Sequence, residues 1–160
     1  MKYKLFSLFA FILLLLPISG CKPDPASLMS AVKTNNTEDA KKLIGKGADA
    51  NSRTSPTGWS ALHYAARNGN VEIVRLLLNA GADPNYTGAM EGQTGSVISL
   101  KPLVIARANL DLVIEIPSSS MEATLRQNGL NDPALVKSMS DPTAADRYQE
   151  VVDTLTKVTK

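Results

Sequence analysis

The sequence of 160 residues contains one cysteine, one histidine and one tryptophan. A single cysteine excludes a disulfide framework, and one cysteine with one histidine excludes an ordinary zinc site built from these residue types. Net charge is also small, because Lys2 and Lys4 account for the formal charge of +2 and the other 140 residues carry fifteen basic and fifteen acidic side chains. A neutral chain with few aromatic rings lacks the positive surface and the stacking platforms that nucleic acids require. We therefore expect one neutral domain that does not bind nucleic acid.

Residue types that commonly carry catalysis are not grouped in the sequence. His63 is the sole histidine, and the serines at positions 118–120 have no histidine predicted nearby to activate them. Gly88, Gly92 and Gly95 lack the preceding strand, following helix and lysine of a phosphate-binding loop, so we expect a flexible loop there. The sequence predicts that the protein is not an enzyme and that it holds no metal or cofactor.

The first twenty residues have the pattern of an export signal. Lys2 and Lys4 form a positive start, and residues 5–16 are dominated by Leu and Phe. This apolar run is too short for a membrane-spanning helix, which needs about twenty residues, so a signal peptide is the better interpretation. The segment Ile18-Ser19-Gly20-Cys21 resembles the lipobox of bacterial lipoproteins, in which small residues flank the cleaved bond. The alternative is an ordinary signal peptide followed by a chance cysteine.

The resemblance to bacterial lipoproteins implies that residues 1–20 are removed and that Cys21 carries covalent lipid such as palmitate. Two or three acyl chains hold a protein durably on a membrane. By similarity to enterobacterial sorting, Lys22 favours the outer over the inner membrane, although this rule varies between bacteria. We expect a lipid-anchored protein of the bacterial cell envelope that faces the periplasm, with residues 21–25 as a short extended tether.

The rest of the chain contains an internal repeat. Residues 28–51 and 62–85 align without a gap at an offset of 34, with nine identities in 24 positions. The apolar residues of 71–78 are too many for one narrow stripe, which indicates a helix buried between neighbours. Ser60 is placed to cap a helix, and Gly69 and Gly81 are placed to end two helices in the left-handed conformation. This pattern predicts stacked pairs of helices.

The second copy, residues 58–85, resembles an ankyrin repeat. Gly58-Trp59-Ser60-Ala61-Leu62-His63 stands where that family has G-x-T-P-L-H, and Gly81-Ala82-Asp83-Pro84-Asn85 closes the repeat. The resemblance implies an all-α solenoid of about three helix-turn-helix repeats. It also implies a structural role for His63, whose ring would bond to the backbone of a neighbouring loop.

Three repeats would divide the domain of residues 26–160. Residues 26–57 form a capping repeat opened by Asp24 and Pro25, and residues 58–90 form the full repeat. The helices of the capping repeat carry four lysines that we expect on an outer face in water: Lys33, Lys41, Lys42 and Lys46.

Residues 101–160 are interpreted as a divergent, split repeat. Residues 101–106 resemble the start of a first ankyrin helix, and the matching second helix is expected only after Asp141-Pro142. An insertion of roughly 35 residues separates them. In it, Ser119-x-x-Glu122 suggests a capping box, and Asp132-Pro133 suggests a second short helix through Met139.

Ankyrin proteins contact partners through loop tips and through the concave face made by the first helix of each repeat, so the resemblance implies protein binding. Trp, Tyr and Arg are enriched at binding hot spots. Carried over by position, five residues are expected at this face: Trp59, Tyr64, Arg67, Asn68 and Tyr86. The alternative is that Trp59 packs on Pro56 and that Tyr64 fills a groove between first helices.

We therefore expect a monomeric, membrane-anchored module that binds another protein. Two more specific functions remain open: a periplasmic immunity protein that neutralises a toxin enzyme, and a factor that protects the envelope against oxidative stress. The sequence does not identify the partner, because proteins with the same repeat fold bind many unrelated partners.

Overall fold

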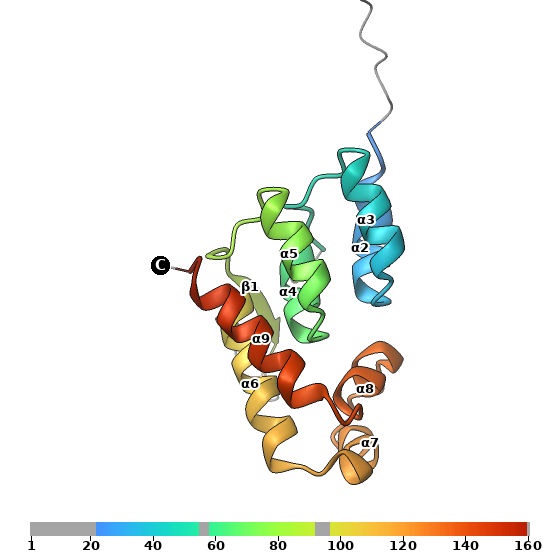
Figure 1. Cartoon of the computed structure of the whole chain (residues 1–160), viewed down its shortest axis with the longest axis vertical. Helices are drawn as coiled ribbons and strands as arrows, with labels where there is room; N and C mark the ends of the chain where they lie inside the picture. The colour runs from blue at the N-terminus through green and yellow to red at the C-terminus, as the bar shows by residue number, and fades with distance from the viewer. Residues whose placement is uncertain (1–21, 55–57, 92–96, 160) are drawn as a thin grey trace, which may run out of the picture.

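The computed structural model in Figure 1 describes residues 22–54, 58–91 and 97–159. Within these residues the chain forms eight helices and a two-stranded hairpin. The elements in chain order are α2 (Pro25–Lys33), α3 (Thr37–Gly45), α4 (Ala61–Arg67), α5 (Val71–Asn79), β1 (Gly88–Glu91), β2 (Val97–Leu100), α6 (Pro102–Glu115), α7 (Ser118–Gln127), α8 (Pro133–Met139) and α9 (Ala144–Thr156). The expected signal peptide and Cys21 lie outside the described residues.

The helices stack as pairs in two layers (Figure 1). α2 packs on α3 and α4 packs on α5, while along the stack α2 contacts α4 and α3 contacts α5. The stack continues with α6 against α4 and α9 against α5, and α6 packs on α9. One layer therefore contains α2, α4 and α6, and the other contains α3, α5 and α9. The expected all-α solenoid of helix pairs is confirmed, with a third pair whose members are 28 residues apart in the chain.

The turns inside the first two pairs are built alike. Asn36 and Asn70 cap α3 and α5, and each amide oxygen accepts a hydrogen bond from a first-turn N–H, at 3.1 and 2.9 Å. Asn35 and Gly69 precede them with φ of 58° and 62°, so the left-handed conformation expected at Gly69 is confirmed. A Cβ added at Gly69 would lie 2.9 Å from the ring of Tyr148 on α9. Only the second turn therefore requires glycine on steric grounds.

The core lies between the two layers. Ala65 and Ala66 of α4 are fully buried, and their small side chains allow the neighbouring helices to approach closely. Ile73, Val74 and Leu77 of α5 are also fully buried. Burial on this scale is the main source of stability in a stack of short helices, which would be marginal alone.

Gly88 begins a strand where a flexible loop was expected. β1 pairs antiparallel with β2, in a register that places Gly88 opposite Leu100. Gly88 is buried, and a Cβ added there would lie 2.8 Å from Cδ1 of Trp59 and 3.2 Å from Nε2 of His63. The glycine therefore serves close packing on the second repeat rather than flexibility. Gly92 and Gly95 lie outside the described residues.

The insertion between α6 and α9 contains α7 and α8. Asp132 caps α8 by accepting a hydrogen bond from the N–H of Ala134 at 3.0 Å, as the Asp-Pro signal predicted. The capping box expected from Ser119 and Glu122 is wrong. α7 begins after Pro117 without a side-chain cap, and Glu122 instead forms an ion pair with Arg126 at 2.7 Å.

The last helix begins later than expected. α9 begins at Ala144 rather than at Asp141-Pro142. The carboxylate of Asp141 accepts hydrogen bonds from the N–H and the hydroxyl of Thr143, at 2.7 and 2.6 Å. These bonds hold a turn in front of the helix, so an Asp-Pro pair marks a turn here and a helix start at α8.

Candidate functional site

Trp59, the first residue expected at the binding face, has only 8 % of its surface exposed. Its indole Nε1–H donates a hydrogen bond to the carbonyl of Ala89 at 2.8 Å, and its ring lies against Gly88. The expected exposure of Trp59 at the binding face is wrong, because β1 packs over its indole. Pro56, the alternative packing partner, lies outside the described residues.

His63 joins α4 to the same hairpin. Nε2 of its ring lies 2.9 Å from the carbonyl oxygen of Leu100 and 3.1 Å from the backbone nitrogen of Gly88, and Nδ1 lies 2.7 Å from the hydroxyl oxygen of Ser60. Burial lowers the pKa of His63 below 6.5, and the bond to Leu100 opposes this shift only in part. The structural role expected for His63 is confirmed, since its ring is a neutral link between a helix and the hairpin backbone.

Arg67 and Asn68, at the end of α4, bond to other elements of the fold. The guanidinium of Arg67 lies 2.6 Å from the carboxylate of Asp132, and 18 % of the Arg67 side chain is exposed. Asn68 is fully buried, and its Nδ2 donates to the carbonyl of Val32 at 3.1 Å. This burial corrects the expected place of Asn68 on an accessible face.

The ion pair between Arg67 and Asp132 is electrostatically favourable. Burial alone would raise the pKa of Asp132. The hydrogen bond and charge of Arg67, together with the N–H groups of Leu135 and Ala134, outweigh burial and lower the pKa below its usual range. Both partners are therefore charged at neutral pH, and they fasten α8 to the end of α4.

Tyr64 and Tyr86 are half-buried, and each lies beneath a cation. The Lys33 Nζ lies 4.9 Å from the centroid of the Tyr64 ring, and the Arg53 Cζ lies 3.9 Å from that of Tyr86. Lys33, which was expected on an outer face in water, is half-exposed and lies over the Tyr64 ring. The two tyrosines therefore position basic side chains.

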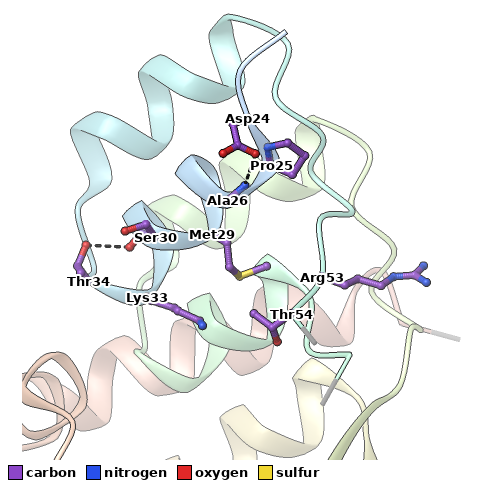
Figure 2. A pocket seen from close by; sticks show the side chains of 9 residues that line it. All are labelled: Asp24, Pro25, Ala26, Met29, Ser30, Lys33, Thr34, Arg53 and Thr54. Carbon is purple, nitrogen blue, oxygen red and sulfur yellow. Dashed lines mark hydrogen bonds between the residues drawn. The ribbon is translucent and has the colours of Figure 1, made fainter. Parts of the chain in front are cut away.

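Next to these cations is a hollow of about 630 Å³ between α2 and the loop that follows α3 (Figure 2). Met29 and Lys33 extend from α2 toward Thr54 on the opposite wall, and Arg53 points outward at the far end. Ser30 lies on the exposed surface of α2 within the same hollow. The hollow is thus an accessible site on the layer of α2, α4 and α6.

A second hollow of about 410 Å³ adjoins the first. Lys33 and Thr34 line both hollows, and the second is closed on its other side by Pro133 and Lys137 of α8. We call the two hollows together the cationic trough, because Arg53, Lys33 and Lys137 are its basic residues. None of these three forms an ion pair with a carboxylate within the part of the chain that the structure describes.

Sequence reasoning missed the basic residues of the trough. The offset of 34 between the repeats places Lys33 at the position of Arg67, so the repeat symmetry contained a signal for Lys33. Arg53 and Lys137 carry no such signal, because one lies in a loop and the other in the insertion.

The stacked helix pairs are those of a repeat solenoid. Proteins of this class bind partners through the first helices of the repeats and the loops between them. A family model for ankyrin repeats, in three copies, matches residues 7–94, which is more than half of the chain. The match begins inside the segment interpreted above as a signal peptide. The chain belongs to the ankyrin repeat family.

Curated relatives agree with this assignment. A putative ankyrin repeat-containing protein of Treponema pallidum is 36% identical over 118 residues, which are 72% of this chain and 37% of the relative. Ankyrin repeat domain-containing protein 40 of Mus musculus is 32% identical over 133 residues, or 80% of this chain and 36% of the relative. The mitochondrial disaggregase of Bos taurus is 48% identical over 60 residues, or 38% of this chain and 9% of the relative. The chain therefore spans only a small part of the disaggregase and little more than a third of the other two.

Ankyrin repeat proteins are generally binding modules for other proteins rather than enzymes. The similarity to the disaggregase supports no catalytic function for this chain, because the match covers only 9% of the disaggregase. Among the described residues, no group of three or more His, Cys, Asp or Glu side chains could hold a metal ion. None of the described helices is long and apolar enough to cross a membrane.

Proposed function

We propose that this chain is a lipid-anchored binding module of the bacterial cell envelope that holds a partner protein in the cationic trough. The observation that carries the proposal is the accessible trough on the layer of first helices, the layer that ankyrin repeats use for binding. Trp59 and Asn68 act within the fold, and the partner contacts the side chains around Ser30 and Lys33 instead.

The anchor in this proposal is lipid on Cys21. Its support is the charged start, the apolar run of residues 5–16 and the cysteine after small residues. Asp24 lines the trough and lies three residues after Cys21, so the two are at most about 10 Å apart in an extended chain. The partner would therefore be held close to the membrane surface.

Site-specific photo-crosslinking in a bacterium that produces the full chain tests this function. A photoreactive phenylalanine replaces Ser30, which is exposed inside the trough, or Glu38, which is exposed on α3 in the other layer. We expect a defined protein adduct from position 30 and none from position 38. No adduct from position 30, or the same adduct from both positions, would contradict binding at the trough.

A further inference from the structure

We infer that the cationic trough selects an extended acidic segment of the partner, with Asp or Glu side chains spaced along it. This inference rests on the proposed function and specifies the chemistry of the occupant. Arg53 lies at one end of the trough, Lys33 lines both hollows, and Lys137 lies on the α8 side. Three cations that border two neighbouring hollows match carboxylates spaced along one extended segment.

The charge of the trough is not balanced by its own walls. Asp132 lines the second hollow, but Arg67 compensates its charge at 2.6 Å. Asp24 is the remaining carboxylate, at the edge of the first hollow, where it accepts a hydrogen bond from the N–H of Ala26 at 3.1 Å. Arg53, Lys33 and Lys137 therefore exceed the uncompensated negative charge, although the chain after residue 20 is neutral.

Two of the cations are held in place before any ligand arrives. Lys33 lies over the ring of Tyr64 and Arg53 over the ring of Tyr86, at 4.9 and 3.9 Å. A ring contact restrains the side chain and leaves its N–H groups available for a carboxylate. Charge-assisted hydrogen bonds formed by restrained donors lose less conformational entropy on binding.

The shape of the trough favours a peptide over other anions. Lys33 and Thr34 line both hollows, so the site extends from the loop after α3, past the end of α2, to α8. Pro133 is exposed and gives the second hollow apolar surface that suits the methylene groups of Glu side chains.

The test uses fluorescein-labelled octaglutamate and the full chain in nonionic detergent, with binding measured by fluorescence anisotropy. We expect Lys33→Gln and Lys137→Gln each to weaken binding by about two- to fivefold, the range of exposed ion pairs. Lys41→Gln is the matched control, because Lys41 is an exposed lysine on α3 outside the trough. Binding should also weaken as sodium chloride is added. Circular dichroism verifies that each variant is folded.

Absence of octaglutamate binding, or an equal loss in the Lys41→Gln control, would overturn the inference. Preferential binding of phosphatidylglycerol vesicles or of single-stranded DNA through the same two lysines would also overturn it. Failure of the inference and of the proposed function can be told apart. If an adduct forms at position 30 but the crosslinked segment of the partner lacks Asp and Glu, the acidic ligand is wrong and binding at the trough stands. If no adduct forms at position 30, the proposed function itself is wrong.

Discussion

Truncation of Trp59 to alanine is expected to destabilise the second repeat and to release the β1–β2 hairpin. The indole is 8 % exposed and contacts β1 through Gly88 and the carbonyl of Ala89. It also lies beside two rings of α4, with centroids 5.7 Å away for His63 and 5.2 Å away for Tyr64. Trp59 therefore joins the hairpin to the helix, in addition to the contacts of His63.

The expected loss of unfolding free energy includes the packing of the ring and its hydrogen bond. Removing a buried aromatic ring costs about 3–5 kcal/mol of unfolding free energy, because the lost contacts are not replaced. The hydrogen bond of 2.8 Å from Nε1 to Ala89 contributes about 1 kcal/mol of this loss. Trp59→Phe keeps most of the ring and removes the donor, so it should lose about 1–2 kcal/mol.

Urea unfolding of the full chain in nonionic detergent, followed by far-ultraviolet circular dichroism, measures both variants. The wild type provides an independent check, because Trp59 is the sole tryptophan and its fluorescence should resist quenching by acrylamide until the chain unfolds. A loss below about 1 kcal/mol for Trp59→Ala would refute the packing argument. An equal loss for Trp59→Phe would show that the hydrogen bond, not the ring, holds the hairpin.

Three further changes have definite expected outcomes. Leu77→Ala should cost about 2–5 kcal/mol in the same urea assay, because the side chain is fully buried, and a loss under 0.5 kcal/mol would contradict the stacking. Burial lowers the pKa of His63, so below about pH 6.5 the unfolded chain binds a proton that the folded chain does not. The free energy of unfolding should therefore be highest above about pH 6.5 and should fall as the pH decreases below that value. A flat wild-type curve, or an equal fall in His63→Gln, would contradict this. Radiolabelled palmitate should enter the wild type but not Cys21→Ser, and equal labelling would remove the lipid anchor.

The repeat architecture could be predicted because its signals are local. Gly69 and the Asp132-Pro133 pair each specify backbone geometry within a few residues, and both predictions are confirmed. The offset of 34 then sets the stacking, since equivalent helices occupy equivalent layers.

The position of Trp59 could not be predicted in the same way. Its burial depends on two strands of four residues each, which have no counterpart in the aligned repeats. The cationic trough could not be predicted for a related reason, because Lys137 and Lys33 line the same hollow only when the insertion folds back toward the end of α2. Contacts between distant segments are decided by tertiary packing, which the spacing of residues in one segment does not record.

The wide separation of α6 and α9 gives the domain an uneven order of assembly. Three residues connect the helices within each of the first two pairs, whereas 28 residues connect α6 to α9. Closing the longer connection costs about 2 kcal/mol more chain entropy if it were flexible. The bonds of Tyr148 to the Arg67 carbonyl at 2.6 Å and of Ser138 to the Asn68 carbonyl help to offset this cost. α6 therefore precedes its partner α9 along the chain by a whole insertion, and its apolar surface stays uncovered until the insertion has folded and brought α9 against it.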